Sequence, residues 1–194
     1  MKPWTALSLL LQYPDPELDA AREELERTAA GLPEIERFLA WQRTVGLGEL
    51  QQVYVKTFDF DRRASLHLTY HTHGDRRQRG LELVRLKRRY AQEGFPLGGS
   101  ELPDYLPVLL EFAGLAPQAG EALLNGLRAP LELVRARLHQ TESPYADLLD
   151  ALVTALPKPT GAQVAAARRL AEEGPPTELA TAPSGSAPRF FSRM

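Results

Sequence analysis

Apolar side chains recur every three or four residues along most of this chain, and glycine and proline separate the stretches that carry this pattern. Such spacing is typical of helices with one face in a core, as in the run Leu50, Val53, Tyr54, Thr57 and Phe58. The strict alternation of a strand is sparse, so the sequence predicts an all-α fold. We expect helices at roughly 4–12, 16–30, 33–44, 48–58, 62–73, 75–92, 103–114, 118–140, 144–156 and 161–173.

Length and composition indicate a single folded domain. The chain has 194 residues, of which 43% are hydrophobic and 25% charged, a balance typical of globular proteins. Residues 174–194 are rich in proline, serine, alanine and glycine, so we expect a helical domain over 1–173 and a flexible tail over 174–194.

Charge and cysteine content exclude several classes of function. The formal net charge of -2 provides no overall attraction to nucleic acid or to an anionic membrane. The absence of cysteine excludes disulfides, thiolate nucleophiles and iron–sulfur ligation by this chain. The first apolar run, 4–11, is too short to span a bilayer, and we interpret it as a core helix. A cytoplasmic protein without membrane insertion is expected.

The stretch HLTYHTHGDRRQRG, residues 67–80, raises the question of a metal site. His67 and His71 are four residues apart and would share a helix face. Leu68 stands where a zinc protease would carry its glutamate, and His139 is far away in sequence. A histidine-ligated metal protein therefore remains an alternative, but we expect no metal site.

The basic residues that follow suggest a second alternative, a helical regulator that binds nucleic acid. Leu83, Leu86 and Tyr90 form one stripe of the expected helix, and the basic residues lie largely on the other side. This is the pattern of an amphipathic helix with a solvated face. Because few aromatic residues accompany the charge, no nucleic-acid partner is expected.

The sequence also lacks motifs of covalent or phosphate chemistry. It contains no GxSxG motif, and the glycines of FPLGGSELPD lack the preceding strand and the lysine of a phosphate-binding loop. We therefore expect a protein that is not an enzyme and carries no cofactor of its own.

Two further segments need a structural interpretation. In residues 65–71, apolar and polar residues alternate as in a half-buried strand, but Asp61 as cap and Gly74 as terminator favour a helix. In ELPDYLPVLLEF, 101–112, an N-cap at Asp104 would place Pro107 in the first turn, where proline is tolerated. Asp104 and Glu101 would then lie at the positive end of the helix dipole.

Several segments together resemble one known family. These are LSLLLQYPDPEL (7–18), YVKTFDF (54–60), SLHLTYHTHGDRRQRG (65–80), LKRRYAQEGF (86–95) and ELPDYLPVLLEF. Their ordered combination is similar to the NarJ family of respiratory nitrate reductase assembly chaperones, over most of 4–115. The family's wider group, TorD/DmsD, has a Pro-x-Asp-His-like loop. Here Pro103-Asp104-Tyr105 has tyrosine in place of histidine, which favours the nitrate reductase branch.

The resemblance implies an all-helical bundle of the TorD/DmsD/NarJ type and a cytosolic, non-enzymatic role. Such a chaperone binds the N-terminal segment of the nitrate reductase alpha subunit. It holds the subunit while the molybdenum cofactor and an iron–sulfur cluster are inserted, before membrane anchoring. Molybdenum cofactor delivery proteins are further candidate partners, and a monomer is expected.

A client segment that folds as an amphipathic helix needs an apolar trough with a polar rim. Tyr54, Phe58, Leu66 and Tyr70 are candidates for the trough, although the same side chains would also suit a plain core. Asp59, Asp61, Asp104 and Glu111 are expected to face a basic client, and His67, His71 and His73 would repel it as they gain charge at low pH. The side chains expected to contact the peptide are Tyr54, Phe58, Asp59, Leu66, His67, Tyr70, His71, Arg76, Arg79, Asp104, Tyr105 and Glu111.

Overall fold

The computed structural model describes residues 3–17, 25, 27, 31–99, 101–174 and 176. All the secondary-structure elements among these residues are helices. This confirms the all-α prediction. The first half contains α1 (Trp4–Leu10), α4 (Pro33–Gln42), α5 (Leu47–Tyr54), the π-helix η1 (Val55–Asp59), the 3₁₀-helix η2 (Arg62–Ala64), α6 (Leu68–His73) and α7 (Arg77–Gln92). The second half contains α8 (Leu106–Leu115), α9 (Pro117–Gly126), α10 (Arg128–Gln140), α11 (Ala146–Ala155) and α12 (Gly161–Glu173).

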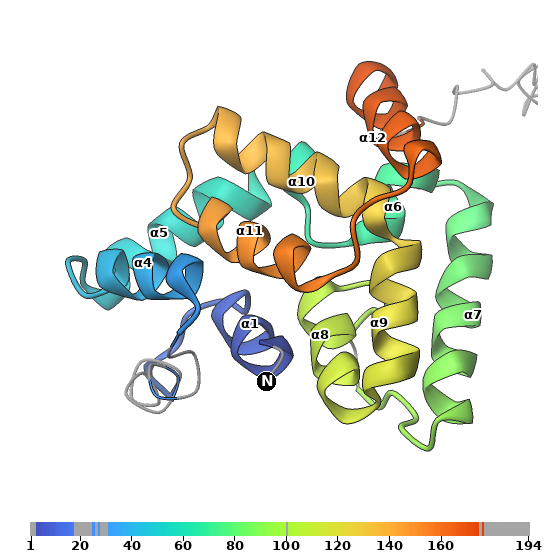
Figure 1. The fold of residues 1–194 in the computed structure, drawn as a ribbon, viewed down its shortest axis with the longest axis horizontal. Coiled ribbons are helices and arrows are strands. Elements are labelled where there is room, and N and C mark those ends of the chain that lie inside the picture. The colour runs from blue at the N-terminus through green and yellow to red at the C-terminus, as the bar shows by residue number, and fades with distance from the viewer. Residues whose placement is uncertain are drawn as a thin grey trace, which may run out of the picture.

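The core is built around α8, which contacts α1 on one side and α9 on another. Four of its side chains have no exposed surface, as their spacing predicts: Leu106, Leu109, Leu110 and Ala113. Figure 1 shows α7, α8 and α9 side by side at one end of the molecule, with α10 and α11 covering the middle. The first apolar run is a core helix, since Trp4 and Leu7 are buried.

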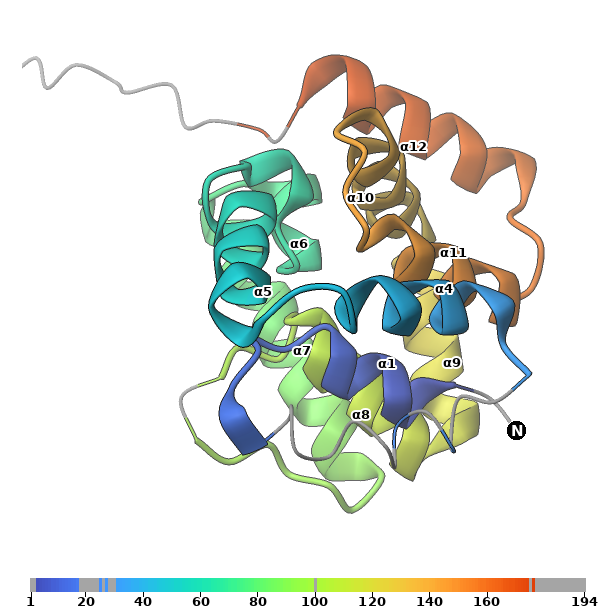
Figure 2. The same cartoon turned by 90° about the vertical axis from the view of Figure 1, so that its left-hand side faces the viewer.

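The last helix, α12, lies on the outside of this bundle. It packs across α10, as Figures 1 and 2 show, but none of its residues is buried. A capping box fixes its start, because the Thr160 hydroxyl accepts a hydrogen bond from the Gln163 backbone N–H while the Gln163 side chain accepts one from the Thr160 N–H. The helix is therefore held by its cap and by partly buried contacts.

The helix expected over 118–140 is two helices, α9 and α10, which meet at Leu127. Pro130 explains the break, because it has no N–H to donate to the carbonyl of Gly126 and cannot occupy a helix interior. The sequence prediction overlooked this proline. It is tolerated where it stands, in the first turn of α10.

The helix expected over 62–73 is also interrupted. Residues 65–67 are extended between η2 and α6, and His67 forms an isolated antiparallel bridge with Tyr105. The alternation of polar and apolar residues there was thus a real signal, although it spans one bridge rather than a strand.

Other predictions fall outside the described residues. Most of the helix expected at 16–30 is not described, nor is the expected tail apart from Gly174 and Pro176. Over the described ranges, no helix combines the length and the apolar character needed to cross a bilayer.

Candidate functional site

One wall of the candidate site is the π-helix η1, which continues directly from α5. Within it Phe58 is 7% exposed, whereas the next residues, Asp59 and Phe60, are exposed. π-helical turns are rare and often occur at functional sites. This turn places an aromatic side chain inward and a carboxylate at the surface within two consecutive residues.

The opposite wall is formed where the segment before α6 meets the segment before α8. The Leu68 N–H donates to the Asp104 carbonyl at 3.0 Å, and the Leu106 N–H donates to the Leu66 carbonyl at 2.9 Å. These bonds bring His67 beside Tyr105, with ring centroids 5.2 Å apart. Two stretches almost forty residues apart in sequence thus form one surface.

Between these walls lies a cavity of about 290 Å³, which we call the aromatic cavity. Its lining is mainly aromatic and acidic and consists of Tyr13, Tyr54, Phe58, Asp59, Ser65, Leu66, His67, Glu101 and Tyr105. The Tyr54 and Tyr105 hydroxyls lie 3.0 Å apart, and the Tyr54 hydroxyl donates to the Leu11 carbonyl at 3.2 Å. Burial, reinforced by Tyr105, raises the pKa of Tyr54. The phenols therefore stay neutral and act as hydrogen-bonding groups.

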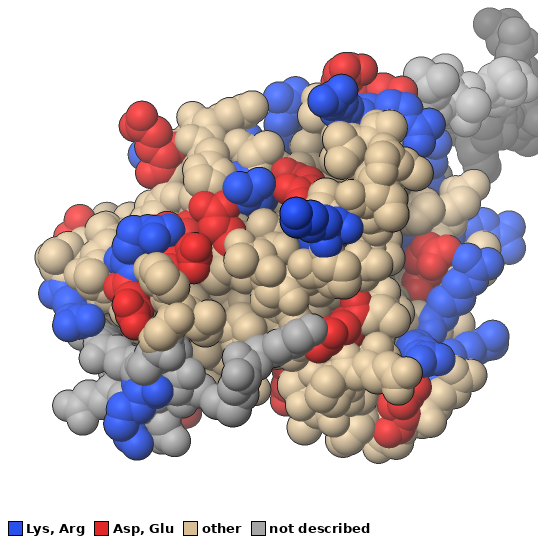
Figure 3. All heavy atoms as spheres, in the orientation of Figure 1, with Lys and Arg blue, Asp and Glu red and all other residues tan. Residues whose placement is uncertain are grey.

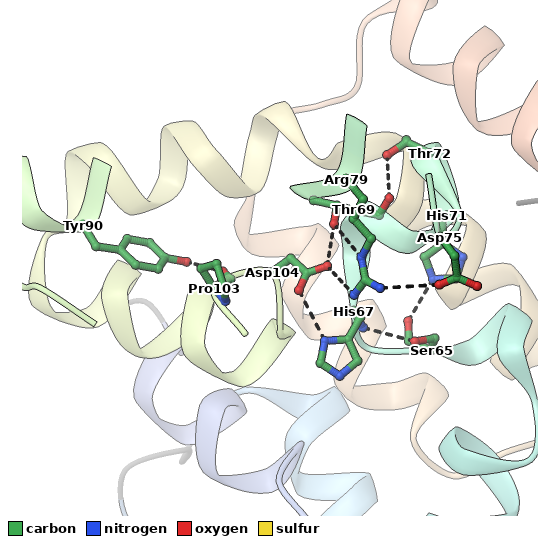
Figure 4. Close-up of polar contacts among 10 residues, drawn as sticks. All are labelled: Ser65, His67, Thr69, His71, Thr72, Asp75, Arg79, Tyr90, Pro103 and Asp104. Carbon is green, nitrogen blue, oxygen red and sulfur yellow. Dashed lines mark hydrogen bonds and ion pairs between the residues drawn. The ribbon is translucent and has the colours of Figure 1, made fainter. Parts of the chain in front are cut away.

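Asp104 lies beneath this surface, with no exposed area, and connects three elements (Figure 4). Its carboxylate accepts a hydrogen bond from Thr69 at 2.6 Å and pairs with Arg79 Nη2 at 3.3 Å. His67 Nδ1 lies 3.3 Å from its other oxygen. Burial alone would raise the pKa of Asp104, but the hydrogen bonds with His67 and Thr69 and the charge of Arg79 outweigh it and lower the pKa. Asp104 is therefore a charged support that holds the loop carrying Tyr105.

His71 is also buried, with no exposed surface. Its Nε2 lies 2.8 Å from the Ser65 carbonyl, and its Nδ1 has no hydrogen-bond partner among the described residues. Burial lowers the pKa of His71, because the charged imidazolium would lose its hydration. The expectation that His71 gains charge at mildly acidic pH and faces a client is therefore wrong.

Half of the side chains expected to contact a peptide line the aromatic cavity: Tyr54, Phe58, Asp59, Leu66, His67 and Tyr105. Tyr54, Phe58 and Leu66 are nearly buried, so they form the floor of the cavity and part of the core at once. Their burial in the core cluster agrees with the alternative of a plain core, and contact with a peptide at these positions stays a prediction.

The other expected contacts lie elsewhere. Tyr70 lies outside the cavity lining, and its ring faces the Arg79 guanidinium at 5.8 Å. Glu111 lines a different cavity beside α8, and Arg76 is exposed at the start of α7.

Two of the expected acidic contacts are already engaged by arginine. Asp61 pairs with Arg137 at 2.5 Å, and Asp104 is buried against Arg79. Asp104 is also not the N-cap of α8, because Tyr105 occupies that position and the Asp104 side chain turns toward α6 and α7. Pro107 does fall in the first turn of α8, as expected.

Sequence reasoning missed three residues that line the cavity, Tyr13, Ser65 and Glu101. Tyr13 stands next to the Pro14–Pro16 turn, and its ring packs edge-on against Tyr54 at 5.5 Å. Glu101 was interpreted only as a charge near a helix end, but it is exposed at the cavity. An aromatic residue at a proline-rich turn was the available signal for Tyr13, and nothing in the sequence singled out Glu101.

The histidines and arginines of 67–89 do not form a site of their own. Over the described residues, no group of three or more His, Asp or Glu side chains is arranged to hold a metal ion. The basic side chains of α7 lie along one edge of the molecule in Figure 3, and Arg85 and Arg89 pair with the neighbouring Glu82 and Glu93. This is the solvated helix face that the sequence predicts.

Comparison with known proteins shows which family this chain belongs to. The sequence profile of the nitrate reductase delta subunit family matches residues 16–151, a range that includes the π-helix, α6 and the loop of Asp104. The chain belongs to this family. A probable nitrate reductase molybdenum cofactor assembly chaperone, NarJ, from Bacillus subtilis is 38% identical over 163 residues, which cover 79% of this chain and 87% of that protein.

Two other known proteins are similar to a comparable degree. The nitrate reductase molybdenum cofactor assembly chaperone NarJ of Escherichia coli is 37% identical over 157 residues, covering 76% of this chain and 66% of that protein. The nitrate reductase-like protein NarX of Mycobacterium tuberculosis is 36% identical over 154 residues, which are 77% of this chain but 23% of that much longer protein. The resemblance to the NarJ family is thus confirmed.

Proposed function

We propose that this protein is a nitrate reductase assembly chaperone and that its aromatic cavity receives the N-terminal segment of the reductase alpha subunit. It would act as a monomer in the cytoplasm, without catalysing a reaction itself. While the segment is held, the molybdenum cofactor and an iron–sulfur cluster would be inserted into the alpha subunit, before the subunit reaches its membrane anchor. The names of the similar chaperones support the general role, and the lining of the cavity supports the binding site.

The observation that carries the proposal is the combination of an aromatic floor with an acidic rim. Tyr54, Phe58 and Tyr105 provide apolar surface for an anchoring side chain, and Asp59 and Glu101 are exposed at the edge. Among the residues that the structure describes, no Lys or Arg belongs to this lining. A segment that carries an apolar residue close to a basic one would match both features.

The size of the cavity favours moderate affinity. A volume of about 290 Å³ is small for a ligand pocket. Each buried apolar anchor contributes about 2 kcal/mol, and ordering a peptide costs about 2–5 kcal/mol. Contacts outside the cavity must therefore add to the anchors for binding to reach the micromolar range that we expect, which requires about 8 kcal/mol in total. Such a complex can hold a client and still release it.

Calorimetric titration with a synthetic peptide of the alpha-subunit N-terminal segment tests the proposal. The double variant Asp59→Asn/Glu101→Gln should bind roughly tenfold more weakly, because two rim charges contribute about 1 kcal/mol each at most. The matched control is Glu172→Gln/Glu173→Gln, which removes two exposed carboxylates at the C-terminal end of α12 that do not line the cavity. Equal affinities of both variants and the unchanged chain would place binding elsewhere.

The same titration at two pH values tests the part of the histidine hypothesis that concerns His67, namely that this side chain repels a basic client at low pH. His67 lines the cavity, so a positive charge on its ring would stand beside a basic client. We expect weaker binding at the lower pH, and His67→Gln should remove the difference. An affinity that does not change with pH would exclude the switch.

A further inference from the structure

A second cavity lies along α8, beyond the aromatic cavity. Its volume is about 340 Å³, and we call it the distal cavity. The Tyr90 and Phe112 rings form its floor, with centroids 4.5 Å apart, and both side chains are buried. Leu115 and Phe95 also line it and are 54% and 39% exposed. Apolar surface that the described chain does not cover is therefore available to a partner.

The distal cavity and the aromatic cavity share two walls. The first is one side of α8, whose N-cap residue, Tyr105, lines the aromatic cavity. At successive intervals of three or four positions follow residues that line the distal cavity: Val108, Phe112 and Leu115. This spacing keeps side chains on one side of a helix. The second wall is the segment before α8, because residues 94–98 line the distal cavity and Glu101 lines the aromatic cavity. The two cavities are therefore neighbouring parts of one surface.

The length of α8 sets the distance between the two cavities. At a rise of about 1.5 Å per residue, Tyr105 and Leu115 are about 15 Å apart along the helix axis. A helical client packed along α8 would cover this distance with ten or eleven of its own residues. Eleven residues make about three turns, so two side chains at that spacing face the same way. One amphipathic helix can thus place an apolar anchor in each cavity.

Charge is of the same sign in both places. Glu111, on the exposed side of α8, lines the distal cavity, as Asp59 and Glu101 line the aromatic cavity. Among the described residues, neither lining includes Lys or Arg. A basic residue beside each anchor would therefore meet a carboxylate at both ends of the surface. The contact that the sequence predicts at Glu111 would then be made in the distal cavity.

We propose that the distal cavity binds a second apolar side chain of the same client segment, ten or eleven residues from the first and next to a basic residue. This rests on the proposed function, in which the aromatic cavity binds the first anchor. The distal cavity supplies the contacts outside the aromatic cavity that micromolar binding requires. The client is accordingly an amphipathic helix of at least three turns, with positive charge near both anchors. A shorter segment makes the contacts in the aromatic cavity alone and binds more weakly.

Calorimetric titration with the alpha-subunit peptide tests the second site. We expect Glu111→Gln/Leu115→Ser to weaken binding roughly tenfold, because a carboxylate and an apolar contact are lost together. The matched control is Leu81→Ser/Glu82→Gln on α7, where Leu81 is 56% exposed and neither residue lines either cavity. This control should stay within about twofold of the unchanged chain. Both leucines lie outside the core cluster, so the fold tolerates their replacement.

Comparison with the variant at the rim of the aromatic cavity separates this proposal from the proposed function. If Glu111→Gln/Leu115→Ser binds as the unchanged chain does while Asp59→Asn/Glu101→Gln binds more weakly, the distal site is wrong and the proposed function stands. If the unchanged chain does not bind the peptide at all, both are wrong.

An alanine scan of the peptide, which leaves the chain itself unchanged, measures the spacing of the anchors. We expect two apolar positions ten or eleven residues apart at which alanine weakens binding about tenfold. In NMR spectra of the ¹⁵N-enriched chain, alanine at one position should reduce the peptide-induced shift of the Tyr105 amide, and alanine at the other that of Leu115. Two alanines inserted between the anchors turn the second by about 200° and should abolish the shift at Leu115. Shifts confined to Tyr105, or anchors at another spacing, would overturn the proposal.

Discussion

Arg79 on α7 lies 3.3 Å from the carboxylate of Asp104, whose side chain has no exposed surface. A buried charge is costly unless it is paired and hydrogen-bonded, and the contacts from Arg79, Thr69 and His67 meet this requirement. The pair joins α7 to the loop that precedes α8. The position of Tyr105 in the aromatic cavity therefore depends on an ion pair outside the cavity lining.

Removing the buried carboxylate should destabilise the fold strongly. We expect Asp104→Ala to lower the free energy of unfolding by about 3–5 kcal/mol, because Arg79 and Thr69 lose their partner in a buried site. Urea denaturation measures this. The control is Asp75→Asn: Asp75 lies 3.9 Å from Arg79 but is 75% exposed, so its loss should change stability by less than about 1 kcal/mol. Similar losses for the two variants would contradict the role given to Asp104.

Stability should also fall as the pH falls below 6.5, the ordinary pKa of histidine. Burial lowers the pKa of His71 in the folded chain, so the unfolded chain binds a proton that the folded chain excludes. The loss continues down to the folded-state pKa, with a slope of up to about 1.4 kcal/mol per pH unit. Asp104 adds nothing in this window, because its lowered pKa makes its contribution disappear only at more acidic pH.

Urea denaturation between pH 7.5 and 5.5 checks this slope. The variant His71→Asn should be less stable at neutral pH but should lose part of the pH dependence, and His73→Asn should keep it. The slopes are compared rather than the midpoints, so a general loss of stability does not obscure the result. An unchanged slope in His71→Asn would refute the assignment.

The contact between α8 and α9 depends on Gly120. A Cβ at this position would lie 2.3 Å from the Cα of Ala113, a backbone atom that cannot move aside. We expect Gly120→Ala to cost about 1–3 kcal/mol of unfolding free energy. Gly126→Ala is the matched control, because nothing lies within 4 Å of the added atom, and alanine in a helix is favourable by up to about 1 kcal/mol. Calorimetric melting should separate the two, and equal melting temperatures would disprove the close approach.

Loss of the α12 cap should have a local effect. Thr160→Ala removes one hydroxyl of the capping box, which typically costs about 1 kcal/mol. Because α12 has no buried residues, we expect faster hydrogen exchange at its amides and little change in global unfolding. A comparable rise in exchange within α8 would show that α12 is part of the cooperative core.

Tyr54 and Tyr105, whose hydroxyls bond to each other, should differ in their effect on stability. Tyr54→Phe removes a hydroxyl that bonds both Tyr105 and the Leu11 carbonyl, and should cost about 1–2 kcal/mol. Tyr105→Phe removes one of these bonds from a half-buried ring and should cost less. Urea denaturation of the pair ranks them, and the opposite order would show that Tyr105 has another buried partner.

Helix content and the buried faces were predictable, because the three-to-four spacing of apolar residues reports directly which side of a helix meets the core. Leu106, Leu109 and Leu110 are buried as that spacing indicates. The break at Leu127 needed closer attention to Pro130, a local signal that was present in the sequence.

The site was only half predictable, because the partners of charged side chains depend on which helices meet. Nothing local in the sequence distinguishes Asp59, which is exposed at the cavity, from Asp61, which pairs with Arg137, or from Asp104, which is buried against Arg79. Glu101 reaches the rim only because the bridge between His67 and Tyr105 draws its loop to α6. These pairings join residues at least 25 positions apart in the sequence.

The π-helix at Val55–Asp59 bears on how cavities of this family should be compared. A π-turn holds one residue more than an α-turn, and each residue of an α-helix turns the chain by about 100°. A relative that lacked a single residue in this stretch would therefore place a different side chain in this wall of the cavity, even if every neighbouring residue were identical. Residues that determine specificity within the family should accordingly be identified by superposing the structures of this wall, because sequence alignment alone will misassign the equivalent positions.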